Sequence, residues 1–377
     1  MFPKSCFTFL GGAAAAAVVA IGGVGVVQAT TTDYEWLGTT SNSFTTSTNW
    51  SNATGYGVPT LGTTNSGPLA VANGGTSASP SSGSYMLYSP GSGITTTFSG
   101  TGNLLIGATP GPHAAIGSAT VASGTLVGDG NLTVGQGTNA DTALLTVSGG
   151  AVNAYDVQVN GGGTVAITGG TISNTVATDS SFINNGVVNL SAGSLTLSDA
   201  FSLGTTGGGT LNISGGTASV AGTLSVSTGG ATTGSITLTG GSITAASAVA
   251  LGTSPTETGG GTITFGTGSG VFEMTGFNSG SPNLTFGKNS YFNFLTGSLG
   301  SISINGASLG YFQGLVTAGD IKVSGSTATT SEFAYSSSSG QGIYKLVGSS
   351  VPEPATLGLV SLGGLGILLL GRTRKSA

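Results

Sequence analysis

A repeat of about 23 residues runs through the middle of this 377-residue chain and constrains its fold more than any other feature. Six segments of the type "LLTVSGGAV" and "TVAITGGTI" align with one another. Their turn pairs begin 20, 23, 23, 25 and 27 residues apart, at Gly149, Gly169, Ala192, Gly215, Gly240 and Thr267, and a weaker copy precedes them at Ser123. Because so short a unit cannot bury a core alone, the repeat predicts stacked coils that share one interior.

Within each copy, apolar residues alternate with small polar ones before the turn, which indicates a strand with one buried face. The apolar pairs are Leu145/Val147, Val165/Ile167, Val188/Leu190, Leu211/Ile213, Ile236/Leu238 and Ile263/Phe265. A second set follows in step, at Leu132/Val134, Val157/Val159, Phe201/Leu203, Leu224/Val226 and Val249/Leu251. Each coil therefore supplies at least two short strands. The sequence predicts an all-β fold, a parallel β-helix or β-solenoid of roughly 23-residue coils. Antiparallel hairpins are the alternative, because Gly-Gly corners also suit tight turns.

The first 29 residues have the features of a secretory signal peptide. Lys4 precedes a long apolar run, and Val27 and Ala29 occupy the small-residue positions of a cleavage site. We expect an N-terminal signal helix that is removed after Ala29, with a retained membrane anchor as the alternative. Cleavage there would also remove Cys6, the single cysteine, so the mature chain would have no disulfide, thiolate metal site or cysteine nucleophile.

The last 27 residues combine "VPEP", an apolar stretch at 355–371 and "RTRK". Seventeen helical residues span about 26 Å, which is enough to cross the hydrocarbon core of a bilayer. The basic cluster would hold the terminus on the cytoplasmic side. Pro352 and Pro354 disfavour helix before the span and leave Glu353 in an extended stretch. We therefore expect a C-terminal transmembrane helix.

This order of features resembles the PEP-CTERM protein-sorting signal of Gram-negative bacteria. The resemblance implies that the signal residues are Pro352, Glu353, Pro354, Arg372, Arg374 and Lys375. It also implies export machinery and an exosortase-type sorting enzyme as partners, with the membrane contacted at least transiently through the C-terminal helix. The chain would pass through the inner membrane and reach the cell surface or an extracellular matrix, where exopolysaccharide is a candidate partner. A plain C-terminal membrane anchor is the alternative.

The body resembles passenger regions with autotransporter-associated β-strand repeats, through the repeats themselves and through "YEWLGTTSNSFTTSTNWSN" near the start and "YFQGLVTAGDIKVSG" near the end. We expect five regions: a signal peptide at 1–29, a β/loop region at 30–112, solenoid repeats at 113–272, an aromatic-rich capping region at 273–350 and the sorting signal at 351–377. Phe and Tyr occur twelve times between Phe265 and Tyr344. These rings are expected to cover the last coil, with an exposed ligand platform as the alternative.

Charge and composition limit the chemistry. No Lys or Arg occurs between His113 and Gly287, so nucleic-acid binding through phosphate neutralisation is excluded. His113 is the single histidine, and it lies in a proline-flanked segment that reads as a loop. The aspartates of the repeats occur singly beside turns, where Asp bonds the local backbone.

We therefore expect no catalysis, no metal and no cofactor. The predicted function is that of a surface-destined structural or adhesive β-solenoid. A carbohydrate-active enzyme and a lectin-like glycan-binding module on the same scaffold are the alternatives.

Overall fold

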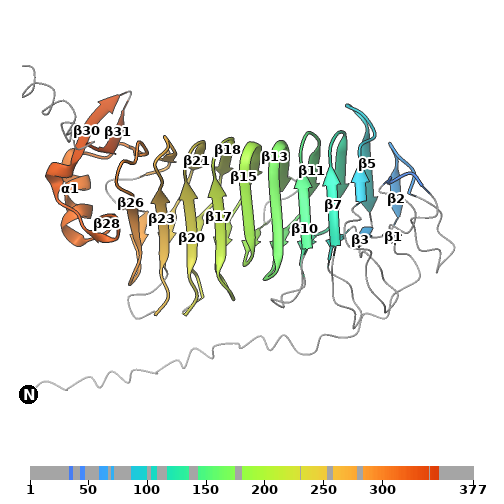
Figure 1. Ribbon diagram of the computed structural model, residues 1–377, viewed down its shortest axis with the longest axis horizontal. Coiled ribbons are helices and arrows are strands. Elements are labelled where there is room, and N and C mark those ends of the chain that lie inside the picture. Colours follow the sequence, from blue (N-terminus) through green and yellow to red (C-terminus); the bar gives the residue numbers. More distant parts are fainter. Residues whose placement is uncertain are drawn as a thin grey trace, which may run out of the picture.

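The computed structural model shows an elongated parallel β-solenoid, closed at its C-terminal end by a small cap (Figure 1). The residues that the structure describes are 34–36, 43–46, 59–66, 69–71, 86–99, 103–107, 117–135, 143–174, 181–229, 231–252, 258–277, 283–338 and 340–347.

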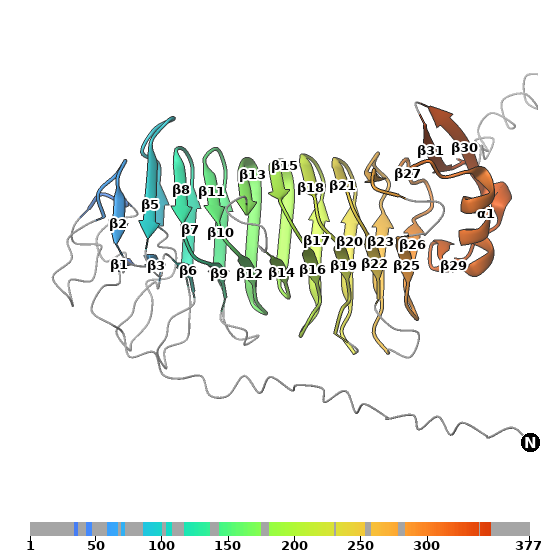
Figure 2. The same cartoon turned by 180° about the vertical axis from the view of Figure 1, so that it is seen from behind.

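Each full turn contributes strand segments to three ladders, in which equivalent segments from successive turns pair in parallel (Figures 1 and 2). Ladder 1 contains β4 (Met86–Tyr88), β7 (Gly117–Val121), β10 (Ala143–Val147), β13 (Gly163–Asn174), β15 (Val187–Leu197), β17 (Gly209–Ile213), β20 (Gly234–Leu238), β23 (Gly261–Phe265), β26 (Tyr291–Phe294) and β28 (Ile321–Val323). Ladder 2 contains β2 (Thr64–Ser66), β5 (Thr95–Ser99), β8 (Thr125–Gly128), β11 (Ala151–Ala154), the C-terminal parts of β13 and β15, β18 (Thr217–Val220), β21 (Ser242–Ala245), β24 (Val271–Met274) and β27 (Ser301–Asn305).

Ladder 3 forms a separate ten-stranded sheet, seen from behind in Figure 2. It contains β1 (Tyr34–Trp36), β3 (Leu69–Val71), β6 (Leu104–Ile106), β9 (Leu132–Val134), β12 (Val157–Val159), β14 (Phe182–Asn184), β16 (Phe201–Leu203), β19 (Leu224–Val226), β22 (Val249–Leu251) and β25 (Leu284–Phe286). The second apolar pairs of the repeat lie on this ladder, and β14 fills the turn in which the sequence pattern is imperfect.

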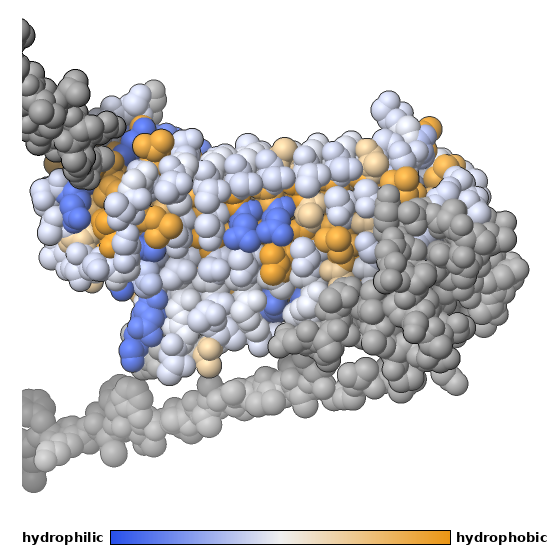
Figure 3. All heavy atoms as spheres, viewed as in Figure 1, coloured by the Kyte–Doolittle hydropathy of each residue, from blue (hydrophilic) through white to orange (hydrophobic). Residues whose placement is uncertain are grey.

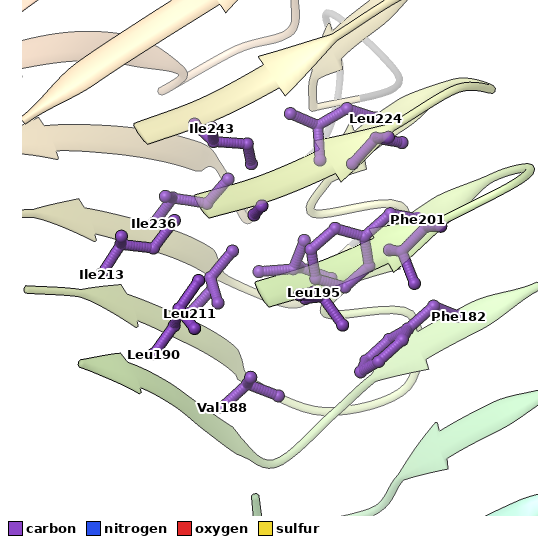
Figure 4. Close-up of a cluster of buried hydrophobic side chains, with 14 of the residues drawn as sticks. Phe182, Val188, Leu190, Leu195, Phe201, Leu211, Ile213, Leu224, Ile236 and Ile243 are labelled. Carbon is purple, nitrogen blue, oxygen red and sulfur yellow. The ribbon is translucent and has the colours of Figure 1, made fainter. Parts of the chain in front are cut away.

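The interior is built from the apolar positions that the repeat predicts. On ladder 1, Leu145 pairs with Val165 and Val165 with Val188, and all three are buried. Figure 4 shows the same arrangement further along, where side chains from different ladders meet in the interior: Phe182, Val188, Leu190, Leu195, Phe201, Leu211, Ile213, Leu224, Ile236 and Ile243. Because stacked coils repeat at about 4.8 Å, each inner side chain packs on its equivalent in the next turn.

The prediction of a parallel β-solenoid is confirmed, and the ladders show why hairpins do not form in the repeats. Every ladder pairing from β4 to β26 in ladder 1 is parallel. Among the described strands, antiparallel pairing occurs at the C-terminal end, between β27 and β31 (Gln341–Leu346), between β28 and β29 (Ser326–Thr327), and between β30 (Phe333–Ser338) and β31.

The ladders begin before residue 113, within the segment in which the sequence suggests a looser β/loop region. Leu69 of β3 pairs with Leu104 of β6, and Leu104 pairs with Leu132 of β9. All three side chains are buried. At the other end, β24 to β27 continue the ladders beyond residue 272. The stack of turns is therefore longer than the segment that shows a clear sequence repeat.

The cap follows β27. Helix α1 (Leu309–Ala318) begins at Ser308, whose side chain accepts a hydrogen bond from the Tyr311 backbone N–H at 3.2 Å. It ends at Gly319, which adopts the left-handed conformation. The short 3-10 helix η2 (Thr330–Glu332) leads into the β30–β31 hairpin, and β31 pairs with β27. This antiparallel strand replaces the next parallel turn along β27 and so covers that edge.

The expected signal helix and transmembrane helix lie outside the described residues. Within the described ranges, no helix combines the length and apolar character that a membrane crossing requires.

Candidate functional site

The outer face of ladder 1 carries a row of mostly hydroxyl and amide side chains in register. The ladder 1 outer row consists of Thr120, Thr146, Ala166, Asn189, Asn212, Thr237, Thr264 and Asn293, and it continues in register to Leu87 at one end and to Lys322 at the other. Within it, the side-chain amide of Asn212 donates to Asn189 Oδ1 at 2.9 Å. Most of the coloured surface in Figure 3 is pale, which corresponds to residues of intermediate hydropathy, with small hydrophilic and hydrophobic groups between them. The row is therefore mostly polar, and the exposed Leu144 adds apolar surface beside it.

Ladder 2 has a comparable outer row that includes one carboxylate, Glu273. The row pairs Asn153 with Ser173, Ser219 with Thr244, and Thr244 with Glu273. Ser173 donates to Asn153 Oδ1, and Thr244 Oγ1 donates to Glu273 Oε2 at 3.2 Å. The side-chain amide of Gln341 donates to Glu273 Oε1 at 2.6 Å, which ties the carboxylate to the cap. Glu273 is thus a structural acceptor in this arrangement.

A groove lies where ladder 3 passes into ladder 1. Its walls are three stacked corners, residues 160–164, 185–187 and 206–208, and its volume is about 450 Å³. Glycines fill most of these corners, so main-chain atoms rather than side chains form much of the wall. None of the described residues that line the groove is charged. We call this feature the corner groove.

Asn185 fixes the shape of the corner groove. Its Oδ1 accepts hydrogen bonds from the backbone N–H of Thr205 at 2.8 Å, from Thr205 Oγ1 at 3.0 Å and from the backbone N–H of Thr206 at 3.1 Å. In the turn before, Asn160 Nδ2 donates to the carbonyl of Gly135 at 3.0 Å. Each asparagine side chain therefore holds the corner of a neighbouring turn, and the groove is rigidly built.

The aromatic residues of the C-terminal part are mainly interior. Phe265 stacks on Phe294 with ring centroids 4.4 Å apart, and Tyr344 stacks on both Phe312 and Phe333 at 4.7 Å. All five rings are buried. Tyr291 is partly exposed, and Lys322 Nζ lies 3.8 Å from the centre of its ring. These buried rings therefore fill the end of the solenoid.

The described carboxylates are dispersed. Asp156 Oδ1 accepts from the backbone N–H of Ser181 at 2.6 Å and from its hydroxyl at 3.1 Å, so it links two turns. Asp320 lies in the cap, where burial raises the pKa of its carboxyl. Among the described residues, no three His, Cys, Asp or Glu side chains gather in a group that could hold a metal. His113, Asp141 and Asp179 lie outside the described residues.

The residues predicted for sorting and cleavage also lie outside the described part of the chain: Pro352, Glu353, Pro354, Arg372, Arg374, Lys375, Val27 and Ala29. Comparison with known families nevertheless tests the tail, because residues 350–375 match the PEP-CTERM protein-sorting motif. The chain carries a PEP-CTERM sorting signal. The motif implies that the protein is exported and is recognised by exosortase-type sorting machinery.

The PEP-CTERM motif covers only the tail, and the comparisons add nothing for the body. No curated protein and no solved structure matches the chain. The β-solenoid is compatible with a passenger-type domain, although no autotransporter repeat family is matched. The function of the solenoid therefore has to be argued from its own surfaces.

The corner groove is the feature that sequence reasoning missed. The "GGGT" segments at Gly161 and Gly207 are visible in the sequence, but their recurrence reads only as corner chemistry. Their separation of two turns is the available signal, since it places both on the same side of the solenoid. The neighbouring turns decide which of these glycines face open space. The repeat pattern alone does not predict that packing.

Proposed function

We propose that this PEP-CTERM protein is a non-catalytic structural and adhesive element of the cell envelope or of an exopolysaccharide matrix. The observation that carries the proposal is the ladder 1 outer row, in which hydroxyl and amide groups repeat in register on a stiff scaffold. Regular uncharged polar groups suit many weak hydrogen bonds to an extended hydroxylated surface, and each bond adds a modest net free energy.

Two further features support an extracellular structural role. The sorting motif directs the chain out of the cytoplasm, and the cap protects the C-terminal end of the ladders. A capped solenoid can stay soluble without its edge strands pairing with other chains.

Retention at the surface is tested by comparing the full chain with a variant that lacks residues 350–375 in the native host. Intact mass would be measured separately in inner membrane, surface and medium fractions. We expect the protein expressed from the full-length sequence to be recovered outside the inner membrane in a processed form that lacks residues 1–29 and the C-terminal tail. Full-length protein retained in the inner membrane would refute the surface role.

Adhesion is tested by adding charge to the ladder 1 outer row. Thr237 and Thr264 are neighbours in this row, and replacing both with Asp should weaken attachment of purified protein to matrix material at least threefold. The matched control is Ser202→Asp with Ser225→Asp, two neighbours on the outer face of ladder 3. Equal attachment of both double variants and the wild type would remove the outer row from the proposal.

Absence of catalysis is tested by incubating the purified mature chain with a panel of neutral and acidic polysaccharides and following reducing ends and unsaturated products. We expect no turnover above that of heat-denatured protein. Reproducible turnover would favour the carbohydrate-active enzyme instead.

A further inference from the structure

Gly207 and Gly208 line the corner groove, yet the fold requires glycine at neither position. A Cβ on Gly207 would lie 3.7 Å from the Asn185 carbonyl oxygen, and one on Gly208 would lie 3.7 Å from the Thr233 carbonyl oxygen. These are ordinary contact distances, and neither residue has a φ in the left-handed region. A Cβ on Gly209, in contrast, would lie 2.1 Å from the Asn184 carbonyl oxygen.

The other glycines of the corner groove are constrained in different ways, and Gly162 adopts a φ of 80° that favours glycine. Gly163 and Gly186 are required for stacking, because a Cβ on either would approach a carbonyl oxygen of the preceding turn to 2.3 or 2.4 Å. Packing does not account for the missing side chains of Gly207 and Gly208. What these two glycines do is leave the groove open, since any longer side chain there would enter its 450 Å³ or cover it.

The groove also presents polar atoms for which the described residues supply no partner. Asn185 is 8% exposed, and its Oδ1 holds the next corner. Within the described residues, no acceptor lies at hydrogen-bond distance from its Nδ2. Asn160 uses its Nδ2 to bind Gly135, and no described donor reaches its Oδ1. Neither atom is among the fully buried polar atoms that lack a partner, so both are open to the groove, where the hydroxyl groups of a ligand can reach them.

The charge around the groove selects the class of ligand. The lining residues that the structure describes are all uncharged, and the chain has no Lys or Arg from residue 113 to residue 287. Asp129, Asp156 and Asp199 are the charged residues of the described turns around the groove. An acidic polymer would meet no positive partner and would be repelled. The groove follows three turns stacked at about 4.8 Å, so its shape suits an elongated ligand parallel to the solenoid axis.

We propose that the corner groove binds a neutral, hydroxyl-rich polysaccharide chain that lies along the solenoid axis. The sugar hydroxyls accept from Asn185 Nδ2, donate to Asn160 Oδ1, and bond the exposed main chain at Gly207 and Gly208. The proposal rests on the proposed surface function, because an exported protein meets such chains outside the cytoplasm.

The test uses the full mature chain and affinity electrophoresis through gels that contain a neutral glucan, mannan or galactan, or the acidic polymers alginate and hyaluronate. The groove-filling variant is Gly208→Leu, with Gly208→Ala as the smaller step. The matched control is Gly314→Leu, because Gly314 is exposed in α1 and a Cβ there meets nothing within 4 Å. A second variant, Asn185→Asp, keeps the acceptor that holds Thr205 and Thr206 but removes the Nδ2 donor.

We expect at least one neutral polymer to retard the wild type, and both acidic polymers to leave its mobility unchanged. Gly208→Leu and Asn185→Asp should weaken this binding at least tenfold, Gly208→Ala less, and Gly314→Leu not at all. Circular dichroism and melting temperature should stay near wild type for Gly208→Leu.

Three results would overturn the proposal: no retardation by any neutral polymer, preference for an acidic polymer, or unchanged binding by Gly208→Leu. Each leaves the proposed adhesive function standing, because that function is measured separately through Thr237 and Thr264. Conversely, the Thr237→Asp, Thr264→Asp variant could lose attachment to matrix material and still bind the neutral polymer as the wild type does. That result would show that the outer row and the corner groove act independently.

Discussion

The central turns and the C-terminal end fill the same interior with different side chains. In the centre the inner positions are mostly Val, Leu and Ile, and Phe182 and Phe201 are the aromatic pair, at 4.8 Å and edge to face. At the end the rings form a connected series, in which Phe294 lies 4.4 Å from Phe265 and 5.3 Å from Phe333. Phe333 in turn stacks on Tyr344.

The difference follows from the number of neighbours that a turn has. A central side chain is covered from both directions by equivalent side chains about 4.8 Å away, so a small aliphatic group is enough. The last turn has no successor. Large rings and antiparallel strands from the cap take the place of the missing turn and leave no open edge.

The largest expected effect is at the aromatic end. Phe294→Ala removes a buried ring that contacts both the preceding turn and the cap, and should lower the free energy of unfolding by about 3–5 kcal/mol. Urea denaturation would measure the loss. Hydrogen exchange should increase mainly in residues 291–347, because each turn contacts only its neighbours.

Leu211→Ala gives the corresponding test in the centre, where the loss should be about 2–5 kcal/mol. Hydrogen exchange should then increase in turns on both sides of β17. If Phe294→Ala instead exposed the whole solenoid while Leu211→Ala remained local, the assignment of a separable cap to the C-terminal end would be wrong.

The second prediction compares a glycine of the central turns with a glycine of the cap. The first is required by close packing between turns and the second by its backbone conformation. Gly209→Ala forces a Cβ to within 2.1 Å of a carbonyl oxygen of another turn, so the ladders must move apart, at a cost of about 1–3 kcal/mol or more. Gly319→Ala meets no atom within 4 Å but places Ala at φ 83° after α1, at a cost of about 1 kcal/mol. Melting temperatures of the two variants would be compared. A smaller loss for Gly209→Ala than for Gly319→Ala would contradict the close contact between turns.

The same contrast explains how much of the fold was predictable. Alternation at Leu145/Val147 and Val157/Val159 predicts ladders 1 and 3, because apolar side chains mark the inner positions directly. The early turns lack this signal. In β5 the inner positions are Thr96 and Phe98, and Thr96 is fully buried because the Tyr88 hydroxyl donates to its Oγ1 at 2.9 Å. The Gly62 backbone N–H also donates to this oxygen, at 3.1 Å, and a threonine buried by such long-range hydrogen bonds cannot be recognised from alternation alone.

The site was less predictable than the fold. The sorting tail is recognisable because its chemistry is local in sequence. The corner groove brings together Asn160, Asn185 and Gly208 from three turns, and the distinction between Gly208 and Gly209 depends on atoms of other turns. Composition shows that glycine is abundant, but it does not show which glycine is free to change.

The third prediction is that removing the hydroxyl group from two buried tyrosines changes the free energy of unfolding in opposite directions. No described partner lies within hydrogen-bond distance of the Tyr344 hydroxyl, which is buried in the cap. Tyr344→Phe should therefore stabilise the protein by up to about 1 kcal/mol. Tyr88→Phe should destabilise it by about 1 kcal/mol, because the Tyr88 hydroxyl donates to Thr96 Oγ1 and lies 2.9 Å from the Thr125 carbonyl oxygen. Urea midpoints that move in the same direction would refute this difference between the two ends.

The smallest effect, and the one that depends on pH, concerns carboxylates. In the cap, burial raises the pKa of the Asp320 carboxyl. Burial first, and the nearby Asp320 second, raise the pKa of Tyr311 to about 12. A raised carboxyl pKa means that the folded state holds the proton more tightly than the unfolded state. Wild-type stability is therefore greater below the ordinary value of 3.8 and is lost as the pH rises through the folded pKa.

Asp320→Asn removes this loss, so its melting temperature should exceed that of the wild type at pH 7, and the difference should vanish near pH 3. Asp156→Asn is the central counterpart. The Asp156 carboxylate accepts two hydrogen bonds from Ser181, so its neutralisation weakens charge-assisted bonds between turns and should lower the melting temperature at pH 7. Calorimetry of both variants from pH 3 to pH 8 separates the two cases. A higher melting temperature for both variants at neutral pH would contradict this prediction. It would show that the Asp156 carboxylate does not stabilise the contact between turns.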